Sequence, residues 1–201
     1  MKLHALRRNL FAALLLSVST TICMAGGPFQ ILTGQSLGFS EKGKRYLLGD
    51  SAKSLLQAFG PSEQVSEDNY EGSTAENFTR EEYDKHYLAY TRSHMYVNDG
   101  VTITEGRDGR VRGITFRIAA TESYSASPAR TDTGLSSGSS LRDVYRIYGE
   151  PFKTKQDELL GYKSLRVYYR RGDHVFSFNF KDGRLSSIGL NAGYLPYLEG
   201  K

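Results

Sequence analysis

The chain has 201 residues, and its 26 basic and 22 acidic residues give a formal net charge of +4 at pH 7. Three of the basic residues and none of the acidic ones lie within residues 1–25, so the rest of the chain is almost neutral. The charge therefore gives no reason to expect a nucleic-acid-binding protein. Cys23 is the only cysteine, which excludes a disulfide framework and a catalytic thiol in the residues that follow it.

Residues 1–25 have the pattern of an export signal peptide. A positively charged start precedes an apolar run at residues 10–18, and the small residue Ala25 suits cleavage directly after it. The apolar run is too short to predict a membrane span. An alternative is a lipoprotein acylated at Cys23, which the preceding Thr20-Thr21-Ile22 disfavours. We therefore expect an exported, periplasmic protein that has no transmembrane segment once the signal is removed.

Residues 26–48 are rich in glycine and weakly patterned, which predicts an N-terminal arm packed on the unit that follows. Within residues 49–61, apolar residues at positions 52, 55, 56 and 59 share one face of a helix. Gly60 lies where a left-handed residue closes a helix. A short helix is therefore predicted at 49–61, at the start of a first repeat unit that spans residues 49–118.

Residues 61–86 form an acidic insertion within that unit. They carry eight acidic residues against two basic ones. Such a segment is either a solvated loop or a functional one, and the sequence leaves both open. Strands with alternating apolar residues follow at 87–97, 101–106 and 110–118, with a turn at Asn98-Asp99-Gly100.

Residues 119–137 are rich in Ala, Ser, Thr, Pro and Gly, and are predicted to be a linker. A second unit spans residues 138–190 and begins with a predicted helix at 138–151. Its strands are expected at 163–170, 174–180 and 184–190. Residues 191–201 are assigned to a C-terminal tail.

The two units share features that indicate a tandem duplication. The run at 181–190, which begins Lys-Asp-Gly-Arg, matches the run at 107–116, which begins Arg-Asp-Gly-Arg. The two helix segments also match each other, at a larger offset because the first unit contains the acidic insertion. We therefore predict an α+β fold, a tandem repeat of a helix packed on a three-stranded antiparallel sheet, with the two sheets either separate or continuous.

The sequence shows no established catalytic or metal-binding pattern. His86, His94 and His174 stand apart, without the spacing of metal ligands. It contains no nucleophile elbow, P-loop or dinucleotide fingerprint. We therefore predict a non-enzymatic protein with no cofactor and no metal site, although reading alone leaves open that carboxylates from distant segments meet in the fold.

In both units, a capped helix that ends in an aromatic residue, Gly and a nearby Pro precedes strands that end in Asp-Gly-Arg-aliphatic-x-x-Ile. This pattern resembles the β-lactamase-inhibitor-protein-like superfamily, and it is similar to the small lipoproteins of the outer-membrane barrel assembly machinery. The resemblance implies two repeats that form one concave sheet, which grips a partner protein. Unlike the inhibitors, this chain has no tryptophan and no disulfide.

The strand alternation predicts where a partner would bind. If the apolar alternates face the helices, the outward face carries Thr102, Thr104, Thr115, Arg117, Arg166, Tyr168, Arg170, Ser177 and Asn179. Tyr and Arg are enriched at protein interfaces. We therefore predict an inhibitor, an immunity-type protein or an envelope-assembly accessory that uses this face to bind an exported or envelope protein.

Two other functions stay open at this stage. One is an envelope hydrolase or a ligand-binding protein that uses the groove between the two repeats. The other is a binder of cell-wall material or lipopolysaccharide that uses the basic residues of 151–172. Salt would weaken such polyanion binding far more than it would weaken an interface with aromatic contacts.

Overall fold

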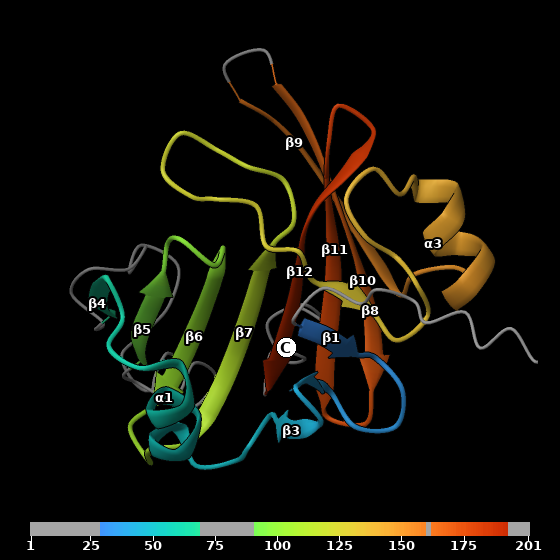
Figure 1. Ribbon diagram of the computed structural model, residues 1–201. Coiled ribbons are helices and arrows are strands. Elements are labelled where there is room, and N and C mark those ends of the chain that lie inside the picture. Colours follow the sequence, from blue (N-terminus) through green and yellow to red (C-terminus); the bar gives the residue numbers. More distant parts are fainter. Residues whose placement is uncertain (1–28, 69–90, 160–161, 193–201) are drawn as a thin grey trace, which may run out of the picture.

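Most of the described chain is β-strand (Figure 1). The computed structural model describes residues 29–68, 91–159 and 162–192, which form two short helices and twelve strands in two sheets. The smaller sheet has the order β3-β2-β1-β8 and consists of β1 (Phe29–Leu32), β2 (Gly38–Glu41), β3 (Lys44–Leu47) and β8 (Arg130–Thr131). The larger sheet has the order β4-β5-β6-β7-β12-β11-β10-β9. Its strands are β4 (Gln64–Asp68), β5 (Thr91–Tyr96), β6 (Val101–Gly106), β7 (Val111–Arg117), β9 (Lys153–Leu159), β10 (Tyr162–Arg171), β11 (His174–Lys181) and β12 (Arg184–Ala192).

The predicted α+β fold, with one helix on each of two three-stranded sheets, is therefore wrong. The described helices, α1 (Ala52–Phe59) and α3 (Leu141–Tyr148), have eight residues each, and four strands of the large sheet follow each of them. The additional strands, β4 and β9, are edge strands rich in charged and polar residues, so they give little hydrophobic signal. The four-stranded sheet escapes sequence prediction because its strands have only two to four residues.

Both helices form inside the segments that predict them. In α3, the Asp143 N–H donates to Ser140 Oγ at 3.3 Å and the Ser140 N–H donates to Asp143 Oδ2 at 2.9 Å, which completes a capping box. Gly60 and Gly149 close the two helices with φ angles of 81° and 74°, a region that favours glycine. Capping at both ends thus explains the bounds of α3, whereas the Ser51 side chain at the start of α1 makes no capping hydrogen bond.

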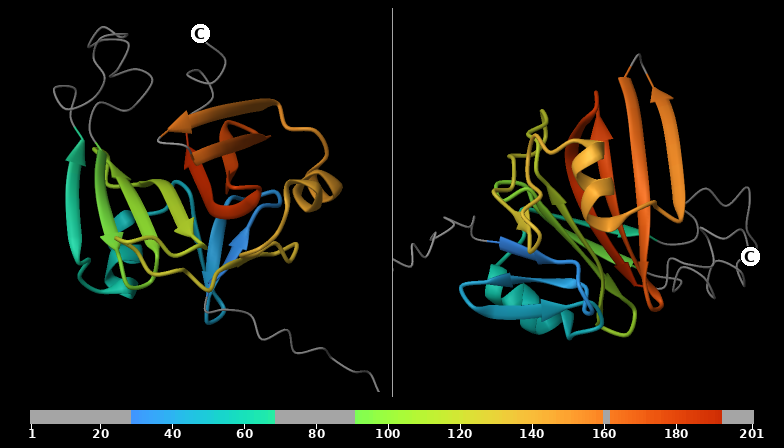
Figure 2. Two further views of the ribbon diagram at one scale, coloured as in Figure 1. Left: turned by 90° about the horizontal axis from the view of Figure 1, so that it is seen from above. Right: turned by 90° about the vertical axis from the view of Figure 1, so that its right-hand side faces the viewer.

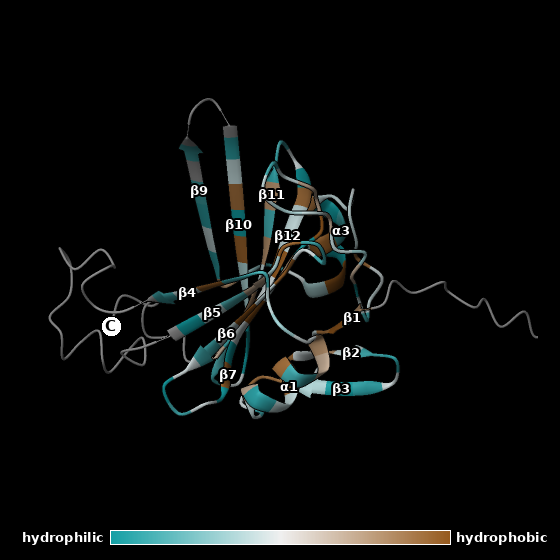
Figure 3. Cartoon of the chain, turned by 60° about the vertical axis from the view of Figure 1, so that its left-hand side comes forward, coloured by the Kyte–Doolittle hydropathy of each residue, from teal (hydrophilic) through white to brown (hydrophobic). Residues whose placement is uncertain are grey.

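Strands β7 and β12 join the two halves of the large sheet. They pair antiparallel from Gly113↔Asn191 to Arg117↔Ser187. The sheet bends around these middle strands, so β4 and β5 at one edge stand at a steep angle to β9 and β10 at the other (Figures 2 and 3). The helices and the four-stranded sheet lie on the convex side, so no described helix or strand covers the concave side.

The core lies between the convex side of the large sheet and the layer of helices and short strands. Phe29 of β1 and Phe39 of β2 contact Phe116 of β7, with ring centroids 5.9 and 5.5 Å apart. In the other half, Tyr148 of α3 contacts Phe178 of β11 at 5.2 Å. These four phenylalanines are all less than 5% exposed. One hydrophobic core therefore extends across both halves of the large sheet.

Several predicted segments have a different structure. The described part of the predicted arm, residues 26–48, contains β1, β2 and β3. The predicted linker, residues 119–137, contains β8, which pairs parallel with β1. The start of the predicted acidic insertion forms β4, whereas its remainder, the predicted signal peptide with Cys23 and most of the predicted tail lie outside the described residues. In the described part of the chain, no helix has the length and hydropathy needed to cross a membrane.

Candidate functional site

The structure places the residues of the predicted binding surface on one side of the large sheet. Directly paired residues of an antiparallel ladder share a face, and so do residues two apart along a strand. The pairs Thr102↔Thr115 and Tyr168↔Ser177 belong to one row across the sheet, with Gly189 between them. The same side carries Thr104, Arg117, Arg166, Arg170 and Asn179, each two residues from one of these positions. We call this concave side the polar face.

One row of the polar face crosses five strands, and we call it the basic rung. It consists of Arg117 on β7, Ser187 on β12, Asn179 on β11, Arg166 on β10 and Lys155 on β9. Arg166 Nε donates a hydrogen bond to Asn179 Oδ1, and Asn179 Nδ2 donates to Ser187 Oγ at 2.7 Å. This chain of hydrogen bonds holds Arg166 in place although its side chain is exposed.

Tyr168 lies next to the basic rung but is only 2% exposed, so it offers a partner little of its ring. Its hydroxyl accepts a hydrogen bond from Arg166 Nη1 at 3.4 Å, and the ring of Phe152 lies 6.5 Å away. Phe152 is 39% exposed, and the Arg170 guanidinium lies 5.3 Å from its centroid, a cation–π geometry. The accessible aromatic ring at this corner is therefore Phe152, while Tyr168 helps to position Arg166.

Small side chains form the middle of the polar face. Gly113 on β7 and Gly189 on β12 lie beside Thr104 and Ser177 in the ladder. A Cβ added to Gly189 would lie 3.0 Å from Ser177 Oγ, and one added to Gly113 would lie 3.3 Å from Thr104 Cβ. Glycine therefore lets these strands carry hydroxyl groups side by side without a clash. The long side chains of the face lie mainly toward β9 and β10.

The polar face is strongly cationic. Its positively charged residues are Arg117, Lys153, Lys155, Arg166, Arg170 and Lys181. No acidic residue occurs among the strand positions of this face whose side chains the structure describes. The face therefore concentrates positive charge in a protein that is almost neutral outside residues 1–25.

Sequence reasoning does not single out Phe152, Lys153, Lys155 or Lys181 as members of this face. Lys153 and Lys155 are alternate residues, which lie on the same side of a strand. The sequence does not predict this placement, because β9 has no apolar alternation that would identify it as a strand. Phe152 precedes β9, and its contact with Arg170 depends on the pairing of two strands.

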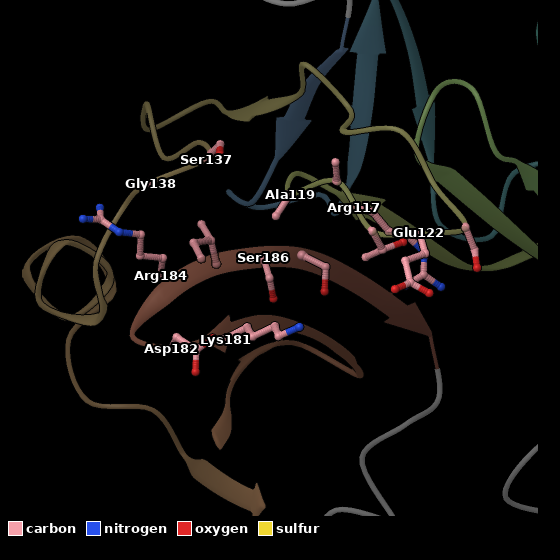
Figure 4. Close-up of a pocket in the computed structure, with 14 residues that line it drawn as sticks. Arg117, Ala119, Glu122, Ser137, Gly138, Lys181, Asp182, Arg184 and Ser186 are labelled. Carbon is pink, nitrogen blue, oxygen red and sulfur yellow. The ribbon is translucent and has the colours of Figure 1, made fainter. Parts of the chain in front are cut away.

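A pocket of about 1180 Å³ opens at the Arg117 end of the basic rung (Figure 4). Arg117 and Glu122 lie on one side of it, and Lys181 and Asp182 lie on the other. The floor includes Ser186 of β12, whose backbone carbonyl accepts hydrogen bonds from the N–H groups of Ile118 and Ala119, where the predicted first unit meets the predicted linker. The pocket lies between the two predicted repeat units and is lined by charges of both signs, which suits a polar ligand or a polar side chain.

Some titratable groups elsewhere in the described chain have structural partners, whereas the buried Nδ1 of His174 has no hydrogen-bond partner among the described residues. His94 Nε2 lies 3.1 Å from Glu105 Oε2, on the helix-facing side of the sheet. Hydrogen bonds from its own backbone N–H and from Val97 and Asn98 lower the pKa of Glu63. The described residues contain no group of three or more His, Cys, Asp or Glu side chains that could hold a metal ion, and His86 lies outside them.

Comparisons with known proteins give only remote likenesses. A scan against protein-family models and a search of the curated proteins give no match. A cysteine-rich secretory protein from Staphylococcus aureus matches at a TM-score of 0.42 and 12% identity, over 74% of this chain and 46% of that one. This chain thus spans less than half the length of that structure. A candidate β-lactamase inhibitor protein from Streptococcus mutans matches at a TM-score of 0.25 and 14% identity, over 80% of this chain and 88% of that one. Scores of this size assign neither a family nor a function to the chain.

Proposed function

We propose that this chain is an exported, non-enzymatic protein-binding module that uses the polar face to hold an exported or envelope protein. The observation that carries the proposal is the division of the large sheet into two sides. The hydrophobic core packs against the convex side, whereas the concave side carries Thr, Ser, Asn and Arg side chains from strands far apart in the sequence. A periplasmic location is part of the proposal and follows from the pattern of residues 1–25.

The size of the polar face suits a protein partner. Eight strands at roughly 4.8 Å spacing give a width of about 34 Å, and three alternate residues along a strand add about 20 Å in length with their flanks. The product is roughly 700 Å², close to the roughly 800 Å² that each partner contributes to a standard interface. Arginine and an exposed aromatic ring are also typical of residues that anchor such interfaces.

Affinity capture from a periplasmic extract tests the proposal. The variant Thr115→Arg places a long side chain in the middle of the polar face, and we expect it to reduce capture of a stoichiometric partner at least tenfold. The matched control is Thr154→Arg, the same substitution at an exposed position of β9 whose ladder partner is the core residue Val167. Capture of the partner by both variants at the level of the wild-type protein would contradict the proposal.

The pocket beside Arg117 favours a second candidate, a ligand-binding protein. In that case Ser186→Trp, which narrows the pocket floor, would abolish binding of a small ligand that co-purifies with the chain, and Thr115→Arg would not. Native mass spectrometry of the purified chain and both variants separates this candidate from the protein-binding module.

A further inference from the structure

We infer that the partner of the polar face presents a strip of acidic side chains, and that the basic rung binds this strip. The inference rests on the proposed protein-binding function and adds the chemistry of the partner. Three features carry it: the sign of the charge on the face, the fixed positions of two arginines, and the spacing between them.

The sign of the charge selects an acidic partner. Six cations occupy the polar face, and the rest of the protein outside residues 1–25 compensates for them almost completely. Complementary charge accelerates encounter and disfavours wrong partners, because like charges repel each other across an interface. A second copy of this chain that docked face to face would bring like charges together. The face therefore suits an acidic protein rather than itself.

Two arginines of the basic rung are held in place before any partner arrives. Arg166 is tied to Asn179 and through it to Ser187, as described above. The Arg117 guanidinium stacks on Tyr124 at 4.1 Å from the ring centroid, and its buried Nε has no hydrogen-bond partner among the described residues. A guanidinium fixed on a sheet or a ring loses little side-chain entropy when it binds a carboxylate, which favours bidentate pairing.

The spacing of the two arginines defines the spacing of the acidic residues that they would bind. Arg117 and Arg166 lie on strands three steps apart, which is roughly 14 Å at about 4.8 Å per step. An extended chain covers about the same distance in four residues, and residues four apart in an extended chain point to the same side. Two acidic residues at positions i and i+4 of an extended segment would therefore reach both arginines at once, and Lys155 lies one step beyond.

Two synthetic peptides test the spacing directly. They are fluorescent, equal in composition and otherwise uncharged, with Glu at i and i+4 in one and at i and i+3 in the other. At low ionic strength, we expect the i+4 peptide to bind the purified chain about tenfold more tightly, because only it can pair with both arginines. Arg166→Glu should remove this preference and Arg166→Lys should reduce it. Lys53→Glu, at an exposed position of α1, should leave it unchanged.

Thermal unfolding of each variant checks that it is folded. Equal binding of both peptides by the natural chain would overturn the inference, and so would a heparin fragment that binds more tightly than either peptide, because that result indicates a general polyanion surface. Partner capture separates the two proposals. If Thr115→Arg abolishes capture while Arg117→Glu and Arg166→Glu preserve it, the protein-binding function stands and the acidic strip does not.

Discussion

Gly100 shows how a single residue fixes the junction between the two halves of the chain. It lies in the turn between β5 and β6 with a φ of 63°. A Cβ at this position would lie 2.5 Å from Ser125 O, 2.7 Å from Ser127 N and 2.9 Å from Arg117 O. All three are backbone atoms, so no side-chain rotation could relieve the contacts. The predicted linker can cross this turn only because the residue here is glycine.

Gly100→Ala should therefore destabilise the protein strongly. The added methyl group combines a positive φ, which costs roughly 1 kcal/mol for a non-glycine residue, with overpacking, which typically costs about 1–3 kcal/mol. We expect the free energy of unfolding to fall by about 2–4 kcal/mol, measured by urea denaturation. The control is Gly172→Ala, where φ is also positive but no atom lies within 4 Å of the added Cβ. An equal loss of unfolding free energy in both variants would show that contacts between Gly100 and the linker do not add to the destabilisation.

At the scale of single residues, the sequence predicts which side of the sheet a side chain faces better than it predicts how exposed that side chain is. Strand alternation predicts that Thr115, Arg166 and Tyr168 share one side of a sheet, and the structure places them there. It does not predict that Tyr168 is 2% exposed while Arg166 is exposed. Exposure depends on neighbours such as Phe152, which reach Tyr168 through the pairing of β9 with β10.

The α3 helix is the element in which sequence and structure agree most closely. Its capping box satisfies backbone N–H groups of the first turn, which have no partner inside a helix. A backbone hydrogen bond from Ser140, supported by the Ser140 side chain and the charge of Arg146, lowers the pKa of Asp143. These are local contacts, and local contacts are what a sequence pattern encodes. The pairing of β1 with β8, by contrast, joins residues about 100 positions apart and is not local.

The lowered pKa of Asp143 predicts a dependence of stability on pH. Because the folded state favours the charged carboxylate, Asp143 contributes stability above the unfolded pKa of about 3.9, and this contribution is lost as the pH falls through the lower folded pKa. Asp143→Asn should thus reduce the thermal midpoint at pH 7 by a few degrees. The difference from the natural chain should shrink below about pH 4. A difference that is constant from pH 7 to pH 3 would rule out a role for the charge.

For the whole molecule, the sequence predicts individual strands and hairpins but not how distant strands pair. The Asp-Gly turns and the apolar alternation indicate β6 and β7, and β11 and β12, because each pair is adjacent in the chain. The pairing of β7 with β12 and that of β8 with β1 join segments about 70 to 100 residues apart. Such pairings leave no local pattern, so neither the concave shape nor the full basic rung follows from the sequence.

The joined sheets predict that the described chain unfolds as one unit. Phe39 of the four-stranded sheet contacts Phe116 of β7, and Phe116 pairs with Ile188 of β12, the first strand of the second half of the large sheet. Phe39→Ala, at a position that is 0% exposed, should cost about 3–5 kcal/mol. If the core is continuous, amides of β10 and β11, in the other half of the large sheet, should lose hydrogen-exchange protection by an equal free energy.

Urea unfolding of the same variant provides an independent measurement. Far-ultraviolet circular dichroism and tyrosine fluorescence should give one transition with the same midpoint, displaced to lower urea. Two separate transitions, with full protection retained in β10 and β11, would mean that the halves fold independently. In that case the polar face would form only when both halves happen to be folded, and the fixed spacing of Arg117 and Arg166 would no longer be available to a partner. Cooperative unfolding is therefore a physical requirement of the basic rung as well as a property of the core.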